Sequence, residues 1–351
     1  MSPRIALLLG IVLLVSAQAL SSFALSPMRG HQAASHQVYG SLKPGEFAGT
    51  LMLGGFRGLA CDLLWLRAQN AKDSGRFYES VALSQTIVQI QPRFEQIWEY
   101  LTWDMAYNIA AEVEDPQSKW SWFIAGVSVN VEGAQRNPQS ERLLRHLAWM
   151  FQHKGDSFRD EIEKSNLSNI INPLLNDINA TLPTTQKIEL IANEPGTGNF
   201  QFSERLYRAT MLVAERNNQR LPPFVRRMIP IAIERDGNRL RNRGEHFAAL
   251  KRYLVSLQDW YGARAWSDKK LADGDDGLDQ QMNTEMSEHN IGRLTRKIIL
   301  LAEQLANDAD AQHRFADAVT GQRWEAAVQI LKENNWKLAV TSGRIRWLDE
   351  Q

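Results

Sequence analysis

The sequence predicts an all-α protein, and two observations support that prediction. From residue 47 onward, apolar residues recur at spacings of three and four, as in Val81, Ile87 and Val88. That is the period of helices that each bury one face. Runs with strand-like alternation are scarce, and LAVTS (338–342) is too short to build a sheet.

Composition excludes several classes of protein. The chain has 351 residues, 44% of them hydrophobic, with 40 basic and 40 acidic side chains. A disordered chain would be less hydrophobic and carry a high net charge. A net charge of zero gives no overall attraction to nucleic acid, so no nucleic-acid partner is expected. The single cysteine, Cys61, excludes an intramolecular disulfide and a cysteine-based zinc site.

The N-terminus has the pattern of an export signal. Arg4 is followed by an uninterrupted run of apolar residues and glycine from Ile5 to Val15. Counted through residue 25, the apolar segment is long enough to cross a bilayer, whereas the small residues at 15–19 resemble a cleavage site. Residues 1–25 are therefore predicted to be a membrane anchor or a cleaved signal peptide, with a buried core helix as the remaining alternative. We expect the body to lie on the extracytoplasmic (periplasmic) side, membrane-anchored, or secreted if the signal is cleaved.

The rest of the chain divides by composition. Residues 26–46 lack apolar periodicity and carry Gly, Pro and Ser, which is typical of a linker. Helical periodicity returns over 47–164. Residues 165–200 are rich in Asn, Pro, Thr and Gly and predict an irregular junction, and residues 201–351 predict a second helical region.

A repeated spacing organises the first helical region. Gly75 is followed by Phe77, Ser80 and Pro92, and Trp98 stands six residues beyond that proline. Glycine suits the left-handed turn that ends a first helix, a small residue lets two helices approach, and proline stops the second helix. Such a hairpin cannot bury its apolar faces alone, so it stacks on its neighbours.

This spacing resembles the tetratricopeptide repeat, a 34-residue helix-turn-helix unit. Matching units start at Cys61, Glu95 and Glu141, and fainter echoes begin at Gly244 and Gly321. The chain departs from the pattern because Arg67 and Ser84 replace bulky or apolar residues, and because the second and third starts lie 46 residues apart. The resemblance implies a TPR-like α-solenoid of antiparallel helix hairpins, preceded by the N-terminal transmembrane or signal helix. Residues 54–68 (GGFRGLACDLLWLRA) also resemble exported bacterial proteins that carry a membrane anchor and divergent repeats of this kind.

In that family the first helices of successive units line a concave groove that binds a peptide or protein partner. The matching positions here share polar or aromatic character and include a tryptophan from each unit. They are Trp65, Gln69, Lys72, Glu99, Trp103, Tyr107, Arg142, Arg145, Trp149 and His153. The alternative is that the three tryptophans belong to the core of repeats that have drifted.

A second candidate surface is basic. It contains Arg226, Arg227, Arg239, Arg241 and Arg243. These residues could meet anionic lipid headgroups or an acidic partner, or they could form a solvated helix face with local ion pairs.

Motifs for catalysis and metal binding are missing from the sequence. There is no phosphate-binding Gly-rich loop and no Gly-x-Ser-x-Gly nucleophile motif. His146 and His153 lack the acidic partner of a zinc motif, and the loop that starts at Asp273 has Thr284 where a calcium loop needs Glu. We therefore expect no catalytic residues, no metal and no cofactor. The sequence favours a membrane-tethered, non-catalytic protein-interaction scaffold of the bacterial envelope. The alternatives are an exported helical enzyme acting on envelope polymers and a structural subunit of an envelope assembly.

Overall fold

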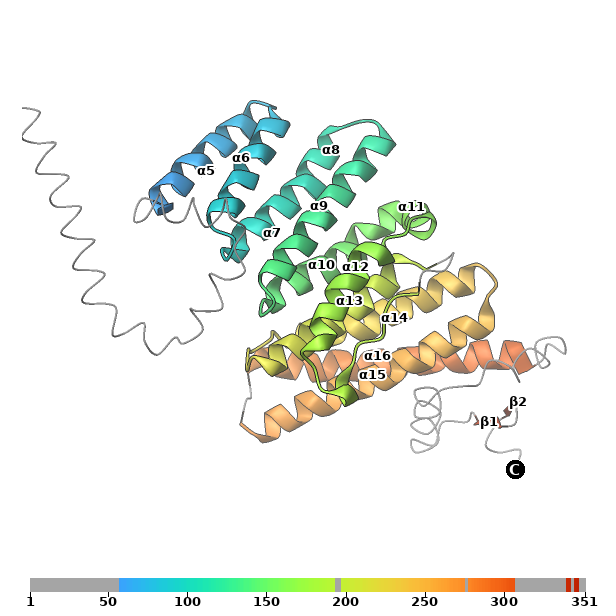
Figure 1. Cartoon of the computed structure of the whole chain (residues 1–351). Helices are drawn as coiled ribbons and strands as arrows, with labels where there is room; N and C mark the ends of the chain where they lie inside the picture. The colour runs from blue at the N-terminus through green and yellow to red at the C-terminus, as the bar shows by residue number, and fades with distance from the viewer. Residues whose placement is uncertain (1–56, 193–196, 275–276, 307–338, 342–343, 347–351) are drawn as a thin grey trace, which may run out of the picture. The chain divides into compact units, whose positions relative to one another are not determined.

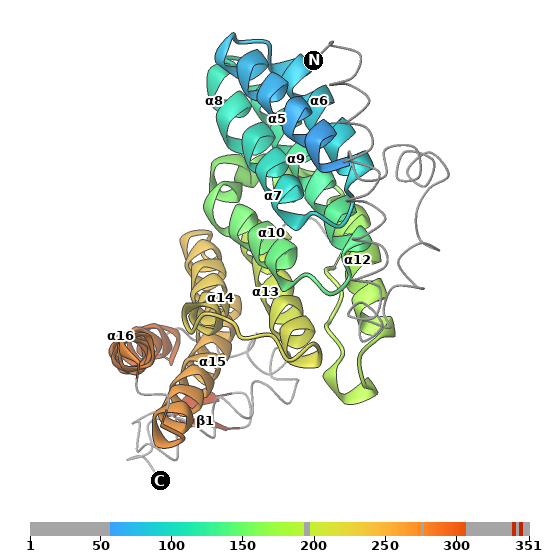
Figure 2. The ribbon, with the colours of Figure 1, turned by 90° about the vertical axis from the view of Figure 1, so that its left-hand side faces the viewer.

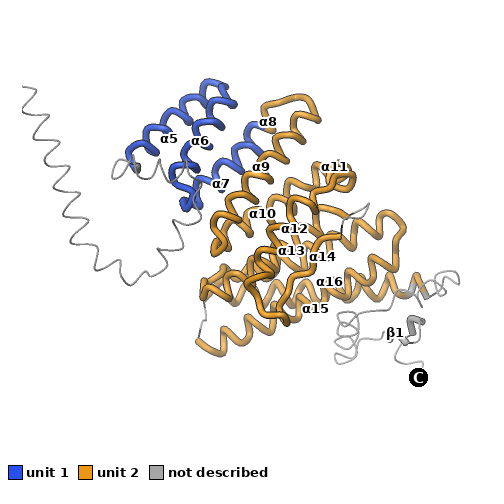
Figure 3. Tube along the Cα trace, viewed as in Figure 1, with its two compact units in different colours: residues 1–109 blue, residues 110–351 orange. Residues whose placement is uncertain are grey.

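The computed structural model describes residues 57–192, 197–274, 277–306, 339–341 and 344–346. Apart from a short two-stranded ladder, these residues form helices packed against one another, which confirms the prediction of an all-α protein. They divide into two compact units between Ile109 and Ala110, coloured blue and orange in Figure 3. The predicted anchor (1–25), the linker (26–46) and the echo that begins at Gly321 lie outside the described residues.

The first unit contains a helix hairpin followed by a third helix. Its elements are α5 (Arg57–Asp73), α6 (Phe77–Ile90), α7 (Glu95–Trp103) and the π-helical segment η2 (Asp104–Ile109). Gly75 has φ +72° in the turn between α5 and α6, a conformation that glycine adopts without strain. Ala68 on α5 and Ser80 on α6 are both fully buried, as small residues are where helices approach closely. Trp98 of α7 donates a hydrogen bond from Nε1 to the Pro92 carbonyl at 2.9 Å.

The second unit holds the remaining elements. Its helices are α8 (Ala110–Glu112), α9 (Pro116–Arg136), α10 (Glu141–His153), α11 (Arg159–Lys164), α12 (Ser168–Ala180), α13 (Asn199–Arg216), α14 (Phe224–Asn242), α15 (His246–Ala272) and α16 (Leu278–Ala306). Two 3-10 segments, η3 (Gly155–Phe158) and η4 (Thr184–Gln186), connect some of them.

A two-stranded ladder completes the described chain. Strand β1 (Ala339–Thr341) pairs antiparallel with β2 (Arg344–Arg346), with Val340 opposite Ile345. The stretch 338–342 was expected to be too short for a sheet. Its residues 339–341 do form a strand, because a close antiparallel neighbour supplies the partner for their backbone.

Packing in the second unit is serial. The most extensive contacts join α10 to α13, α13 to α14, α14 to α15 and α15 to α16. Both views show α14 and α15 lying side by side (Figures 1 and 2). Between α15 and α16 the core is built from large apolar side chains, among them Trp260, Leu257, Leu294 and Ile298, all fully buried. Each of these helices therefore buries its apolar residues mainly against the helices next to it.

The helices of the α14–α15 hairpin lie close together at Gly237. Gly244 has φ +80° in its turn, matching the sequence echo that begins there. A methyl group at Gly237 of α14 would lie 2.7 Å from the Tyr253 ring and 3.3 Å from the Ala249 carbonyl oxygen of α15. Because real carbon contacts are longer than the first of these distances, the hairpin depends on glycine at this position.

Helix α12 holds an extended stretch of chain. The Asn172 carboxamide donates to the carbonyl of Ile191 and accepts from its amide, both at 2.9 Å. Asn179 makes the same pair of bonds to Ile188, both at 2.8 Å. The side chains of Ile188 and Ile191 are buried. Residues 165–200, expected to be an irregular junction, thus contain the helix α12 and a segment without regular secondary structure that hydrogen bonds fix to it.

None of the described helices combines the length and the apolar character that crossing a bilayer requires.

Candidate functional site

In the first unit, three of the residues expected to face a groove, all on α5, gather around Tyr100. Trp65 of α5 packs against the Tyr100 ring with the ring centres 4.4 Å apart. Gln69 donates a hydrogen bond from Nε2 to the Tyr100 hydroxyl at 2.7 Å, and the Lys72 ammonium lies 5.5 Å from the centre of the same ring. The sequence did not single out Tyr100, although it lies on the same helix as Glu99 and Trp103.

A buried carboxylate fixes this cluster. The Lys72 ammonium lies 2.5 Å from the carboxylate of Asp104, whose side chain is only 2% exposed. Burial alone would lower the pKa of Lys72, but the hydrogen bond to Asp104, the charge of that carboxylate and the contact with Tyr100 together outweigh burial and raise it. Burial raises the pKa of the Tyr100 hydroxyl, and the Asp104 carboxylate adds to that effect. At neutral pH the cluster therefore holds an ion pair beside a neutral phenol, with no free general base.

Two further members of the predicted set form a flat aromatic surface in the same unit. Trp103 of α7 and Tyr107 of η2 stack with their ring centres 4.2 Å apart and their planes 10° apart. Trp103 is 39% exposed, unlike the fully buried Trp98 on the same helix. A spacing of four residues places both rings on one side of the helix.

The second unit repeats this arrangement on α10. Trp149 and His153 stack with ring centres 4.6 Å apart and planes 8° apart. Trp149 is half-buried and His153 is exposed. Arg145 donates to the Glu141 carboxylate at 3.1 Å, and Arg142 is half-buried. The opposite side of the helix is buried and holds the residues that match the repeat core, Leu144, Leu147, Ala148 and Phe151.

All ten residues expected to face a groove are at least partly accessible. The three tryptophans are therefore not sealed in the core, whereas Trp98, Leu144 and Leu147 are. Stacked aromatic pairs with an accessible face offer a large apolar contact area at little cost in conformational entropy. Such faces are suited to binding another molecule.

The five arginines expected to form a basic patch do not form one surface. Arg239 is 4% exposed and bonds the carboxylates of Asp236 (2.9 Å) and Glu163 (2.5 Å). Arg241 and Arg243 are exposed near the end of α14, and Arg243 also pairs with Glu163. Arg226 and Arg227 are half-buried about 20 Å away, near the start of the helix. The expectation placed Arg239 at the surface, but its buried partners keep it inside.

A buried ion-pair network that the sequence did not predict joins α11, α13, α14 and α15. Glu204 of α13 is 1% exposed and contacts Arg205, Arg208 and Arg252. Arg252 also contacts Asp236, which links the network to Arg239. A helix-surface spacing is visible in the sequence only for Asp236–Arg239, at i and i+3, and for Glu204–Arg208, at i and i+4. The contacts that join different helices give no such signal, because their partners are far apart in the chain. Each carboxylate is neutralised by arginines, so the network is suited to holding helices together rather than to proton transfer.

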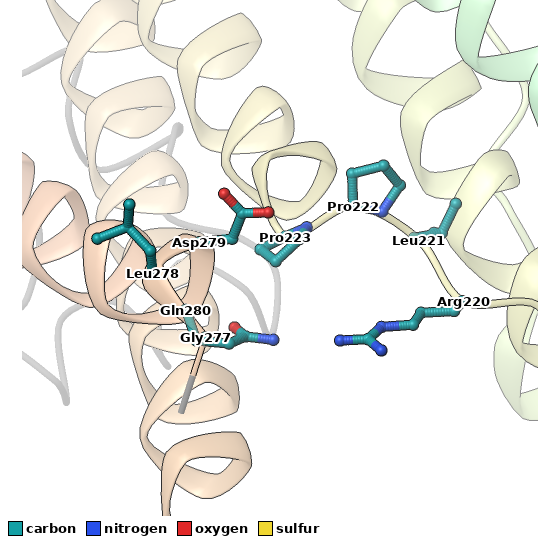
Figure 4. A pocket seen from close by; sticks show the side chains of 8 residues that line it. All are labelled: Arg220, Leu221, Pro222, Pro223, Gly277, Leu278, Asp279 and Gln280. Atoms are coloured by element: carbon teal, nitrogen blue, oxygen red, sulfur yellow. The ribbon is translucent and has the colours of Figure 1, made fainter. Parts of the chain in front are cut away.

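Arg226 lines a pocket in the second unit. Its guanidinium lies 4.4 Å from the centre of the Trp266 ring. The pocket has a volume of about 470 Å³ and is lined by residues of α13, α14, α15, α16 and the α13–α14 turn, among them Met211, Pro222, Arg226, Trp266 and Lys270. A neighbouring pocket of about 520 Å³ shares part of the wall. Figure 4 shows Arg220 and Gln280 pointing toward one another from opposite walls of that second pocket.

Within the described ranges, no group of His, Cys, Asp and Glu side chains is arranged to hold a metal ion. Comparisons with protein-family models, with curated proteins and with solved structures found no match to this chain.

Proposed function

We propose that this protein is a membrane-tethered, non-catalytic interaction scaffold that binds a peptide or protein partner. In this proposal residues 1–25 attach the chain to the membrane and the helical body lies on the periplasmic side. The helices form a TPR-like solenoid, and the residues accessible on their first helices contact the partner. Tethering would raise the concentration of a bound partner at the membrane surface.

The observation that carries the proposal is the recurrence of one aromatic arrangement. Trp103 with Tyr107, and Trp149 with His153, are stacked pairs four residues apart, and each pair has an exposed member. Exposed tryptophan is costly in water and is enriched at interfaces, where it supplies much of the binding energy. The serial packing of α10, α13, α14, α15 and α16 supports the solenoid part of the proposal.

Partner capture with matched variants tests this function. The full chain is purified from detergent extracts as wild type, Trp103→Ala, Trp149→Ala and Tyr78→Ala, and the proteins that co-purify are quantified by mass spectrometry. Tyr78 is the control, because it is an aromatic residue that is 79% exposed on α6, outside the predicted set. The same partner should be lost with both tryptophan variants and kept with the control. Equal recovery from all four proteins would contradict the proposal.

A further inference from the structure

Among the described residues, the charged side chains that line the pocket beside Trp266 are mostly cations. Three cations, Arg220, Arg226 and Lys270, line it together with one carboxylate, Glu215, among the described residues. No carboxylate of the described chain lies within ion-pair distance of Arg226 or Lys270. Burial lowers the pKa of the Arg226 guanidinium, and Glu215 offsets that effect only in part. The charged guanidinium therefore lacks the close anionic partner that normally compensates burial.

Elsewhere in the same unit, comparable arginines are paired. Arg239 bonds Asp236 and Glu163, Arg252 contacts Glu204 and Asp236, and Arg293 bonds Glu234 at 2.5 Å. Arg226 differs from these three because the group against its guanidinium is an aromatic ring. A cation–π contact with a ring satisfies none of the hydrogen-bond donors of a guanidinium, so it does not compete with an incoming oxyanion for them.

The remaining wall of the pocket is apolar. Met211, Ala214, Leu221 and Pro222 supply aliphatic surface next to the cations. The volume, about 470 Å³, falls within the usual range for small-molecule sites. A bare phosphate ion would leave most of this space empty. The walls therefore match a ligand with one strongly anionic end and one apolar end.

We propose that this pocket binds a small amphipathic phosphate ester. The phosphoryl group lies between Arg226, Lys270 and Arg220, where the guanidinium forks and the ammonium donate to its oxygens. The apolar group lies against Leu221 and Pro222. Both a soluble phosphate ester and an anionic phospholipid headgroup have this chemistry. The proposal does not depend on the aromatic faces of α7 and α10.

Hexyl phosphate is the probe for the shared chemistry. The full chain in a non-ionic detergent is titrated by calorimetry with hexyl phosphate, hexanol and inorganic phosphate. We expect saturable 1:1 binding of hexyl phosphate and binding at least tenfold weaker for the other two. The same ligand should slow amide exchange in peptides that cover 219–226 and 266–270. Absence of saturable binding would overturn the proposal.

Three variants place the ligand in the pocket. Arg226→Met and Lys270→Met remove one cation each and keep an apolar stem of similar length. Arg241→Met is the control, because it removes the same charge from an exposed position on α14. Hexyl phosphate should bind about tenfold or more weakly to the first two variants and as well as wild type to the third. Equal affinities for all of them would refute the assignment, and unchanged amide exchange across α15 shows that the variants remain folded.

Vesicles distinguish the two sources of the ester. Flotation is compared between vesicles of phosphatidylcholine with and without phosphatidic acid, for wild type and Arg226→Met. Any binding by the apolar N-terminal segment occurs with both kinds of vesicle. It is therefore removed when flotation without phosphatidic acid is subtracted from flotation with it. Extra flotation that phosphatidic acid gives to wild type and not to the variant assigns the site to a lipid headgroup. Hexyl phosphate binding without that difference assigns it to a soluble ester.

Discussion

The close approach of α14 and α15 makes Gly237 a position where a single methyl group should destabilise the hairpin. Adding it would place a carbon 2.7 Å from the Tyr253 ring. The ring cannot easily move away, because it is fully buried, its hydroxyl donates to Asn238 at 2.8 Å and the Lys297 ammonium lies 4.7 Å from its centre. The Ala249 carbonyl, 3.3 Å from the same methyl position, belongs to the backbone and also resists displacement.

Two opposing effects set the magnitude. Alanine in a helix interior is about 1 kcal/mol more favourable than glycine. Overpacking a tight contact costs about 1–3 kcal/mol. Gly237→Ala should therefore change stability by between about zero and 2 kcal/mol in the destabilising direction. Gly262 on α15 and Gly292 on α16 have no atom within 4 Å of the added methyl, so the same substitution there should stabilise by about 1 kcal/mol.

Hydrogen exchange measured by mass spectrometry is the appropriate assay, because a chain with two compact units need not unfold in one step. Peptides from α14 and α15 should exchange up to about thirtyfold faster in Gly237→Ala than in wild type, since 1.4 kcal/mol corresponds to a factor of ten. The same peptides should exchange no faster in Gly262→Ala. If Gly237→Ala stabilises the hairpin as much as Gly262→Ala does, the close approach described above is wrong.

Two other contacts give quantitative expectations. Asn179→Asp removes the amide that donates to the Ile188 carbonyl and puts an oxygen there instead, so exchange of the Ile188 amide should rise about five- to thirtyfold. Burial alone would raise the pKa of the Glu163 carboxyl, but the hydrogen bonds and positive charges of Arg243 and Arg239 together outweigh burial and hold that pKa below its usual range. The stability that this pair contributes is present above the pKa of an unfolded glutamate, about 4.3, and is lost as the pH falls through the lower folded value.

Each of these expectations has a matched control. Asn169→Asp makes the same change at an exposed position of α12, and it should leave Ile188 exchange unchanged. For the acid effect, Glu163→Gln should lower protection of α11 and α14 at pH 7 and remove its dependence on pH below 5. Glu161→Gln, on the same helix, should behave as wild type. A wild-type profile for Glu163→Gln would show that the pair contributes nothing.

Much of the helical architecture could be predicted because its signals are local. Helical spacing is visible in any window of the chain, and Gly75 and Gly244 mark turns that need positive φ. The burial of Ala68 and Ser80 also follows from spacing within one hairpin.

The candidate site was less predictable because its contacts are not local. Arg239 looks like a surface cation in the sequence, yet its partner Glu163 lies 76 residues away. No pattern in the sequence singled out Tyr100, although the side chains of Trp65, Gln69 and Lys72 on α5 all lie against it. Spacing locates a residue on a helix face, but it does not tell which distant side chain meets that face.

The paired asparagines of α12 have a geometric consequence for the segment they hold. Asn172 and Asn179 are seven residues apart, which is about 10.5 Å along a helix axis. Ile188 and Ile191 are three residues apart, which is about 10 Å in an extended chain. The two lengths agree only when Asn172 faces Ile191 and Asn179 faces Ile188. The two asparagines therefore fix the position of this segment along the helix. Inserting or deleting one residue between the isoleucines would leave at most one asparagine correctly paired, while most changes to the side chains themselves would leave both pairings possible.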